Sequence, residues 1–361
     1  MRIGQRVGQL LWVGFEGKEV PESLAARLRA GEVGGVILYS RNLGTIEENL
    51  ALVGALRAAA PEVLLAPLLA IDQEGGRVQR IREPATVWPP MLRLGDAWER
   101  DAARAEALAG EVGRALGAEL VALGFDVDFA PVLDVHTNPD NPVIGDRAFA
   151  REAEAVARLG GAFAAGLDAA GAIACGKHFP GHGDTSVDSH LELPRVDHAF
   201  ERLRAVELLP FARVRTPLLM TAHVVFAALD AALPATLSPA VLGGLLRGEL
   251  AYDGVVVSDD LEMKAVADHW GVGDAVVRGL LAGCDAFLLC RREDLQVEAF
   301  DALVRAAERD AGVRARVDES AARIAALKAR HFGRRRAAPL AIVGAAAHRA
   351  LAEEMAATPV A

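Results

Sequence analysis

The sequence has few cysteines and no long apolar segment, and both absences limit what the protein can be. The chain of 361 residues contains three cysteines, Cys175, Cys284 and Cys290. Two of them lie in apolar runs, where a thiol packs as a small hydrophobic group, so we expect no disulfide framework. No stretch approaches the roughly 18 uninterrupted apolar residues of a membrane helix. The N-terminal segment also lacks a signal-peptide pattern, so we expect a reduced, cytoplasmic protein that does not enter a membrane.

An excess of positive charge is absent as well. The formal net charge is -10, whereas neutralising phosphates requires a surplus of lysine and arginine, which argues against a general nucleic-acid binder. We interpret the short basic run near the C-terminus as a solvated tail. The 35 glycines and 17 prolines have no fixed period, which argues against collagen-like and solenoid folds. We expect a monomer with a small-molecule ligand.

Apolar runs alternate with long segments of helical period, which is typical of repeated βα units around a parallel sheet. Eight strands are predicted: Leu10 to Val13, Gly35 to Tyr39, Leu65 to Ile71, Val127 to Leu133, Ala172 to His178, Leu218 to His223, Val255 to Ser258 and Ala286 to Cys290. Seven helices are predicted: Ile46 to Ala60, Ala102 to Leu123, Arg151 to Ala170, Phe200 to Arg213, Pro239 to Glu249, Lys264 to Ala282 and Glu293 to Asp310. Ser238 and Asp294 are predicted to lie near helix starts as capping residues.

Eight βα units predict a single (β/α)8 TIM-like barrel. The alternative, a doubly wound open sheet, usually has a glycine-rich phosphate turn after its first strand. Here the glycine-rich run at Gly31 to Val36 precedes a strand instead. We expect a barrel over residues 1–330 and a C-terminal helical extension over residues 331–361, packing on the barrel or trailing from it.

Polar residues gather where the predicted strands end, which is the catalytic face of a barrel. The clusters are Asp72 to Arg77, Asp134, Lys177-His178, His223 and Ser258 to Asp260. A carboxylate after a strand is often only a turn former or helix cap, but five clusters on one rim favour a site. Asp259 is expected to face the mouth of the barrel as a nucleophile or electrostatic stabiliser. Asp260 is expected to be structural, for example as a cap of the next helix.

The segment from Lys177 to His190 has the most unusual composition, with three histidines within thirteen residues. One hypothesis is a metal-dependent hydrolase with His178, His182 and His190 as ligands. The sequence has neither an H-E-x-x-H arrangement nor paired cysteine ligands, so we expect no metal and no other cofactor. The second hypothesis is acid–base chemistry by Asp188 and His190, whose side chains point the same way in an extended loop.

These motifs together resemble a known family. The segment KHFPGHGDT followed by Asp188-Ser189-His190 is similar to the signature loop of glycoside hydrolase family 3 β-N-acetylglucosaminidases of the NagZ type. The resemblance extends over most of the chain, and the motifs occur in the family's order: GGVILYSRN at Gly34, DQEGGRVQR at Asp72, FAPVLDV at Phe129, IGDRAF at Ile144 and SDDLEM at Ser258.

The resemblance implies a retaining enzyme that removes terminal, non-reducing β-linked N-acetylglucosamine from peptidoglycan fragments of the GlcNAc-anhydromuramyl type. It implies that Asp259 is the nucleophile and that His190 is the proton donor and acceptor, oriented by Asp188. It also implies a set of residues that hold the sugar: Asp72, Arg80, Arg147, Lys177 and His178. Alternatives that stay open are a β-glucosidase-type or phosphorolytic enzyme of the same family, the metal-dependent hydrolase, and a non-catalytic sugar-binding barrel.

Overall fold

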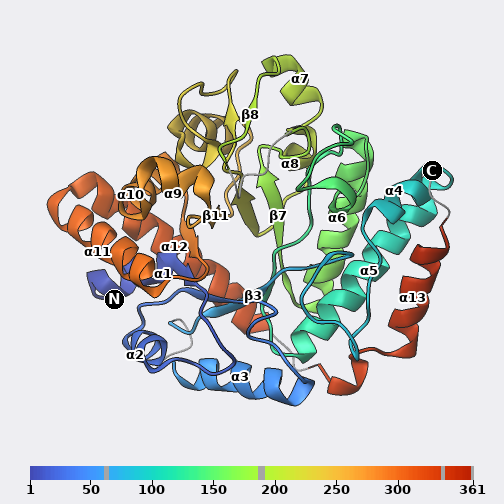
Figure 1. Ribbon diagram of the computed structural model, residues 1–361, viewed down its shortest axis with the longest axis horizontal. Helices are drawn as coiled ribbons and strands as arrows, with labels where there is room; N and C mark the ends of the chain where they lie inside the picture. The colour runs from blue at the N-terminus through green and yellow to red at the C-terminus, as the bar shows by residue number, and fades with distance from the viewer. Residues whose placement is uncertain (61–64, 186–191, 335–337, 359–361) are drawn as a thin grey trace. The chain divides into compact units, whose positions relative to one another are not determined.

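The computed structural model describes residues 1–60, 65–185, 192–334 and 338–358 (Figure 1). The chain divides into two compact units. The first contains Met1–Ala70, Ser189–Pro194 and His223–Arg334. The second contains Ile71–Asp188, Arg195–Ala222 and Arg335–Ala361. Among the described residues, no helix is both long and apolar enough to cross a bilayer.

The strand order defines the fold as a closed barrel of eight parallel strands, β1-β12-β11-β9-β7-β6-β3-β2. Their bounds are β1 Leu11–Val13, β2 Gly35–Leu38, β3 Leu68–Ile71, β6 Val127–Asp128, β7 Ile173–Phe179, β9 Leu218–Thr221, β11 Val255–Asp260 and β12 Ala286–Leu289. Each predicted strand is present, so the (β/α)8 prediction is confirmed. Four shorter strands lie outside the barrel: β4 Gln73–Gly75, β5 Val78–Gln79, β8 Arg195–Val196 and β10 Val225–Phe226.

Strand β6 is shorter than its apolar run predicts. The prediction reached Leu133, but regular pairing with β7 stops at Asp128, and only an isolated bridge joins Val132 to Lys177. Pro131 interrupts this stretch because it has no N–H to donate to a ladder. Strands β3 and β7 are buried along their whole length, as expected where parallel strands are covered on both faces.

In the first unit, helices α1, α10, α11 and α12 pack against one another. The helices of this unit are α1 Ile3–Leu10, α2 Glu22–Ala30, α3 Ile46–Ala58, α9 Lys264–Trp270, α10 Val272–Ala282, α11 Glu293–Arg309 and α12 Ala311–Arg334, with a 3-10 turn η2 Ala235–Leu237 and a π-helix η3 Ala240–Glu249. One helix predicted over Lys264 to Ala282 is broken, because Gly271 has φ +70°, a conformation that favours glycine. Ser238 lies near the start of η3 as predicted, and its Oγ accepts from the Val241 N–H at 3.2 Å, but the N-cap residue of η3 is Pro239.

In the second unit, α5 lies against α6 and also packs on α4 (Figure 1). The helices of this unit are α4 Leu92–Trp98, α5 Ala102–Ala122, α6 Ala153–Ala170, α7 Phe200–Ala205, α8 Leu209–Arg213 and α13 Ala346–Ala357, with 3-10 turns η1 Gly145–Arg147 and η4 Leu340–Ile342. The helix predicted over Phe200 to Arg213 is therefore two helices. Pro210 occupies the first turn of α8, where its missing N–H costs nothing, but it would interrupt a continuous helix.

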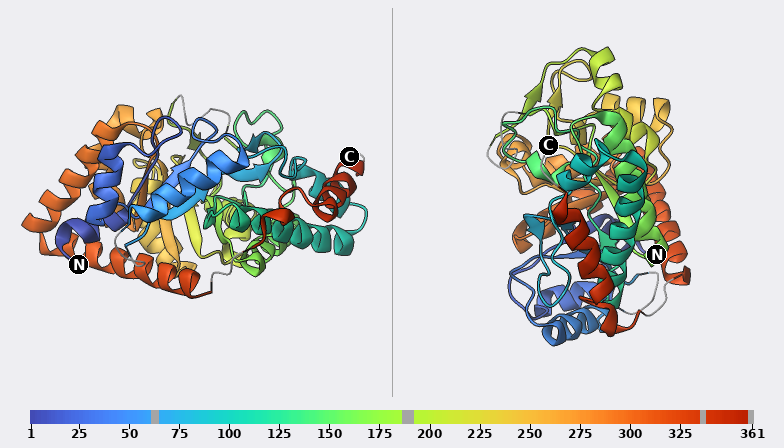
Figure 2. Two further views of the ribbon diagram at one scale, coloured as in Figure 1. Left: turned by 90° about the horizontal axis from the view of Figure 1, so that it is seen from below. Right: turned by 90° about the vertical axis from the view of Figure 1, so that its right-hand side faces the viewer.

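The C-terminal helix α13 lies along α5 (Figure 2). Glu119 of α5 accepts hydrogen bonds from the Gly344 N–H at 3.1 Å and from His348 at 2.7 Å, and Arg104 binds Glu354 through two hydrogen bonds. The segment after residue 337 thus packs on helices of its own unit. The predicted boundary at residue 330 falls inside α12 and stays a prediction.

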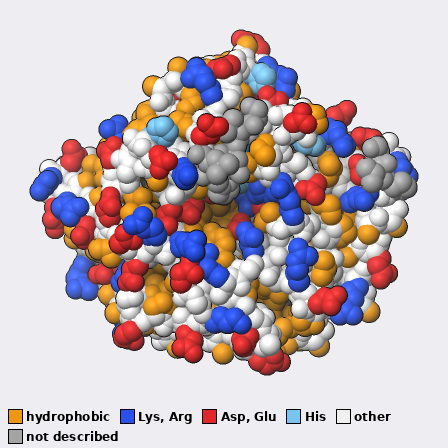
Figure 3. Space-filling view, viewed as in Figure 1, with side chains coloured by type: hydrophobic (Ala, Val, Ile, Leu, Met, Phe, Trp, Pro, Cys, Tyr) orange, Lys and Arg blue, Asp and Glu red, His pale blue; other side chains and the backbone are white. Residues whose placement is uncertain are grey.

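The face of the molecule in Figure 3 carries basic and acidic side chains in alternation. No continuous basic patch is visible among the described residues on that face. This pattern agrees with the net charge of -10 and with the expectation of a small-molecule ligand.

Candidate active site

Among the residues that the structure describes, five of the eight predicted site residues lie in the second unit. Asp72 follows β3, Arg80 follows β5, Arg147 ends the turn η1, and Lys177 and His178 lie in β7. Strand β7 ends at Phe179, one residue beyond the predicted end, so Lys177 and His178 lie in the strand as predicted. The pairing of β7 with β9 shifts its register between Gly176 and Phe179, where these two residues lie.

Lys177 joins the carboxylates of two neighbouring elements. Its Nζ lies 2.9 Å from Asp72 Oδ1 and 2.6 Å from Glu74 Oε1. Arg80 Nη2 lies 3.3 Å from the second oxygen of Asp72. The side chains of Lys177 and Glu74 are each 2% exposed, whereas those of Asp72 and Arg80 are 14% and 27% exposed. Asp72 and Arg80 are consequently the members of this group that a ligand in solution can reach.

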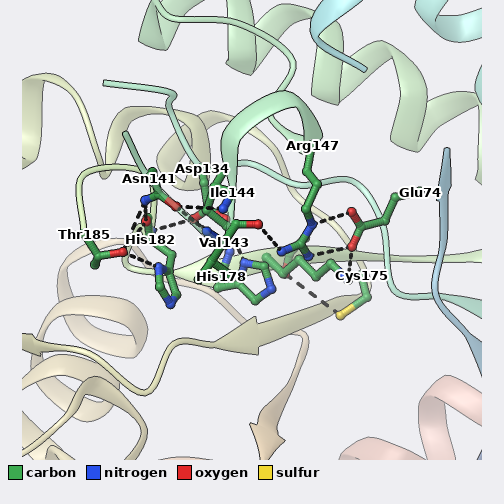
Figure 4. A network of polar contacts seen from close by, with 12 residues as sticks. Glu74, Asp134, Asn141, Val143, Ile144, Arg147, Cys175, His178, His182 and Thr185 are labelled. Atoms are coloured by element: carbon green, nitrogen blue, oxygen red, sulfur yellow. Dashed lines mark hydrogen bonds and ion pairs between the residues drawn. The ribbon is translucent and has the colours of Figure 1, made fainter. Parts of the chain in front are cut away.

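Glu74 is a site residue that the predicted set omitted. Its carboxylate receives two hydrogen bonds from Arg147, one from Nε and one from Nη2, each at 2.8 Å (Figure 4). Arg147 Nη1 also donates to the Val143 carbonyl at 3.1 Å. Bidentate geometry of this kind is the strongest form of a carboxylate–guanidinium pair. The sequence placed Glu74 in the polar cluster that follows β3. It did not indicate that the Glu74 side chain would be buried.

Burial and neighbouring charges shift the pKa values of Glu74, Lys177 and Arg147 in opposite directions, and the effect of the neighbouring charges is the larger one. Burial alone would raise the pKa of Glu74, but the charges and hydrogen bonds of Arg147 and Lys177 hold that pKa well below its usual range. Burial alone would lower the pKa of Lys177, and the charges of Asp72 and Glu74 raise it instead. The pKa of Arg147 is raised for the same reason, because Glu74 outweighs burial. All three groups are therefore ionised near neutral pH.

A second polar group surrounds Asp134, which is fully buried after β6. Its Oδ2 lies 2.7 Å from His178 Nδ1, and its Oδ1 accepts from the N–H groups of His178 and His182 at 3.1 and 2.7 Å (Figure 4). Burial would raise the pKa of Asp134, but the charge and hydrogen bond of His178 outweigh burial and lower it. Asp134 thus fixes the His178 ring, with its Nδ1 held by the carboxylate.

The segment around Asn141 holds the base of the loop that follows β7. Asn141 Nδ2 donates to the His182 carbonyl at 2.9 Å and to Thr185 Oγ1 at 3.2 Å. Thr185 Oγ1 lies 2.8 Å from His182 Nδ1. At Gly183 a Cβ would lie 1.8 Å from the Val135 carbonyl oxygen, so only glycine permits this approach. Nothing in the sequence identified Asn141, because its partners lie about 40 residues away.

The predicted acid–base residues Asp188 and His190 lie outside the described residues. The last described part of their loop is held at Asp184, whose two oxygens lie 2.8 Å from Thr137 Oγ1 and 2.5 Å from His198 Nε2. His198 belongs to the segment between β8 and α7. The loop is therefore anchored from two sides up to Thr185.

Asp259 lies in the first unit, in the last two residues of β11. The strand continues two residues further than predicted, and Asp259 Oδ1 accepts from the Asp260 N–H at 2.8 Å. Asp260 Oδ1 accepts from the N–H groups of Glu262 at 3.1 Å and Cys290 at 3.3 Å. Asp260 thus has a structural role as predicted, but it does not cap α9, whose N-cap is Met263. The predicted helix cap was therefore wrong. The Asp260 carboxyl instead accepts hydrogen bonds from the residues that follow β11 and β12.

Burial raises the pKa of Asp260 to about 7, and the charges of Glu262 and Asp259 add to that increase. In the same unit, His223 Nε2 lies 3.1 Å from the Asp260 carbonyl oxygen, and its Nδ1 lies 2.8 Å from Thr236 Oγ1. His223 is therefore held between two elements of the first unit.

The metal hypothesis depended on His178, His182 and His190. The rings of His178 and His182 lie 5.9 Å apart, edge to face, and Nδ1 of each ring contacts a carboxylate or hydroxyl oxygen. Within residues 1–60, 65–185, 192–334 and 338–358, no three histidine, cysteine or carboxylate side chains are grouped so that they could hold a metal ion. His190 lies outside these ranges.

A closed (β/α)8 barrel whose strand ends carry paired carboxylates, cations and an imidazole defines a barrel enzyme that acts on a polar small molecule. Residues 2–327 match the family described as glycosyl hydrolase family 3 N terminal domain. The chain therefore belongs to glycoside hydrolase family 3, and the protein is a glycoside hydrolase.

Relatives with known names or structures support this assignment. The chain is 45% identical over 287 residues to a beta-hexosaminidase of Alkalilimnicola ehrlichii, which covers 79% of this chain and 81% of the relative. It resembles the solved glycoside hydrolase family 3 beta-N-acetylglucosaminidase from Paenibacillus sp. str. FPU-7, with a TM-score of 0.91, 42% identity, and coverage of 99% of this chain and 69% of that one. It also resembles native NagZ from Neisseria gonorrhoeae, with a TM-score of 0.75, 35% identity, and coverage of 87% and 97%.

Proposed function

We propose that the protein is a retaining exo-β-N-acetylglucosaminidase that removes terminal, non-reducing β-linked N-acetylglucosamine from peptidoglycan fragments. The substrate is a GlcNAc-anhydromuramyl compound, and the enzyme works as a monomer in the cytoplasm. Membership of the family and the similarity to beta-hexosaminidases support this proposal. A related structure, NagZ from Neisseria gonorrhoeae, is known in complex with N-trifluoroacetyl-D-glucosamine.

In the proposed reaction the Asp259 carboxylate attacks the anomeric carbon C1 while the bond from C1 to the leaving oxygen breaks. His190, oriented by Asp188, gives its proton to that oxygen. Water then attacks C1, passes a proton to His190 and displaces the Asp259 carboxylate, which restores the enzyme. Both steps pass through an oxocarbenium-like state, which an anion below C1 stabilises.

The observation that carries the proposal is the arrangement around Asp72. Its carboxylate is partly exposed, while Lys177 contacts one of its oxygens and Arg80 contacts the other. A fixed carboxylate accepts hydrogen bonds from a pair of sugar hydroxyls, and a site built in this way rejects ligands that leave it unpaired. In the proposal His178 and Arg147 complete the sugar-binding set, and Glu74 holds Arg147 and Lys177 in place.

A panel of aryl β-glycosides tests this function. The purified protein is assayed on the β-N-acetylglucosaminide, β-glucoside and β-xyloside, with and without inorganic phosphate and with EDTA. We expect cleavage of the N-acetylglucosaminide, with GlcNAc as the product in phosphate buffer and no loss with EDTA. Preference for the glucoside or formation of a sugar phosphate would refute the stated substrate or acceptor. Loss of activity with EDTA and recovery with Zn²⁺ would refute the stated mechanism.

The nucleophile has a separate test. Incubation with a 2-deoxy-2-fluoro glycosyl donor is expected to accumulate a covalent adduct, because the fluorine slows both steps and a good leaving group restores only the first. Peptide mapping is expected to place the adduct on Asp259. An adduct on Asp260 would contradict the assignment.

A further inference from the structure

Asp128, in strand β6, is a buried carboxyl group to which the proposed reaction gives no role. The residue is fully buried, and its Oδ1 accepts a hydrogen bond from the Gln73 N–H at 2.9 Å. Its Oδ2 is also buried and has no hydrogen-bond partner among the residues that the structure describes. A buried carboxyl with one oxygen unpaired is uncommon and calls for a physical reason.

The reason lies in the charges beside it. Lys177 is already paired with two carboxylates, Asp72 and Glu74. A third ionised carboxylate, with only one donor, would carry a large desolvation cost. Burial raises the pKa of Asp128 well above its ordinary value, and the charges of Asp72 and Glu74 add to this although Gln73 and Lys177 oppose it. The Asp128 carboxyl group therefore ionises less readily than an exposed aspartate does.

The hydrogen bond of Asp128 is placed next to the sugar-binding carboxylate. Gln73 lies between Asp72 and Glu74 in the chain, and its backbone N–H donates the hydrogen bond that Asp128 Oδ1 accepts. On the other side of Asp72, the Ile71 carbonyl accepts from the Phe129 N–H at 2.9 Å. Asp128 of β6 and the next residue, Phe129, thus hold the backbone on both sides of Asp72.

We propose that Asp128 is a neutral positioning residue, which fixes the direction in which Asp72 meets the sugar without adding a charge to the site. This inference rests on the proposed function, in which Asp72 binds sugar hydroxyls. Asp128 itself is fully buried and does not touch the substrate. Its contribution is the acceptor for one backbone N–H, so a neutral amide of the same size fulfils the same role.

Two substitutions at this position separate the acceptor from the charge. Asp128→Asn keeps a carbonyl oxygen of the same reach and cannot ionise. Asp128→Leu has nearly the same volume but no acceptor, and it leaves the Gln73 N–H unpaired. The matched control is Glu119→Gln, a buried carboxylate of α5 that binds Thr86 and the C-terminal segment. KM, kcat and the inhibition constant of free GlcNAc are measured beside Tm.

We expect Asp128→Asn to keep KM and kcat within about threefold of the wild type. Asp128→Leu is expected to raise KM and the GlcNAc inhibition constant about tenfold or more, beyond any fall in kcat, because sugar contacts are misplaced. Glu119→Gln is expected to lower Tm without changing KM. If Asp128→Leu does not fold, Asp128→Ala carries the same expectation.

Equal damage from Asp128→Asn and Asp128→Leu would overturn the proposal, because the charge would then be required. An unchanged KM in Asp128→Leu, with Tm lowered as in Glu119→Gln, would also overturn it, because the role would be purely structural. The KM comparison uses the aryl β-glycoside that the wild type cleaves best. A wrong sugar assignment thus appears in the wild type, and a wrong role for Asp128 appears only in the variants.

Discussion

Single carboxyl groups in this protein have opposite pKa shifts because their neighbours differ. Glu74 is buried and Asp260 is half-buried, but of the two only Glu74 contacts two cations. Its pKa is lowered, whereas burial and two nearby carboxylates raise the pKa of Asp260 to about 7. The pKa of a buried carboxyl group depends on the nearest charges as much as on its burial.

Asp260 makes the stability of the fold depend on pH in a predictable direction. Its pKa is higher in the folded state, about 7, than the ordinary value of about 3.9. It therefore contributes stability below the ordinary value that is lost as pH rises toward and through about 7. We expect Asp260→Asn, which keeps the oxygen that accepts from Glu262 and Cys290, to remove this part of the pH dependence.

The measurement is urea unfolding of the wild type and Asp260→Asn at several values between pH 4 and 8. The difference in unfolding free energy between the two proteins is expected to change in favour of the variant as pH rises. A difference that stays constant over this range would contradict the raised pKa.

His190 gives a prediction that depends on the leaving group. A natural sugar alkoxide needs a proton to depart, whereas an activated aryl oxide needs little. We expect His190→Ala to lower kcat/KM about 10²-fold or more for a GlcNAc disaccharide and much less for an activated aryl N-acetylglucosaminide. Steady-state kinetics on both substrates check this. Equal losses on the two would indicate that the loop has only a structural role.

The loop after β7 illustrates how an element is held by distant parts of the chain. Its first residues bind the segment from Asp134 to Asn141 through backbone and side-chain hydrogen bonds. The close contact of Gly183 with the Val135 carbonyl has no room for a side chain. The position of this loop base is therefore set by packing and not by local turn preferences.

Gly183→Ala is expected to displace the loop base. The added Cβ meets a backbone carbonyl at 1.8 Å, so we expect a loss of stability of about 2 kcal/mol or more, in the range of overpacking, and a clear fall in kcat/KM. Gly54→Ala in α3 is the control, because its Cβ meets nothing within 4 Å. That change is expected to leave stability equal or slightly higher. Unaltered Tm and kcat/KM in Gly183→Ala would contradict the packing.

The sequence predicted the elements better than their ends. All eight strands are present because long apolar runs between helical segments identify buried parallel strands. The breaks at Gly271 and before Pro210 were missed because one helical period continues across each of them. The same limit applies to the site. The sequence identified Asp72 and Lys177, but it did not predict that Glu74 contacts both Lys177 and Arg147, because Arg147 is 73 residues away from Glu74 in the chain.

Across the whole chain, acidic residues exceed basic ones, 49 to 39, yet the candidate site concentrates cations beside carboxylates. Net charge thus describes the chain as a whole, whereas the pairing of neighbouring charges determines the electrostatics of the site. The described part of the C-terminal segment packs on helix α5 and takes no part in the candidate site. It supplies two of the hydrogen bonds that Glu119 receives, and it buries Met355.

Deletion of residues 338–361 is expected to destabilise the protein. Glu119 would lose the hydrogen bonds of Gly344 and His348, which costs about 1–3 kcal/mol for a buried charged group, and the apolar contacts of α13 would be lost as well. We expect Tm to fall by about 5 °C or more, while KM of the folded fraction stays within about twofold. Calorimetry and kinetics on the truncated chain check this. An unchanged Tm would show that α13 contributes nothing to stability.

The sequence by itself determined the barrel, the family and the residue types of the candidate site, because apolar periodicity and short motifs are local properties of a chain. Only the tertiary structure decided which partners these residues have. The contacts of Glu74 with Lys177 and Arg147, of Asp134 with His178 and of Asp128 with the Gln73 N–H all join segments that are far apart in sequence. Burial and the proximity of charges set their protonation, and both arise only when the chain is folded.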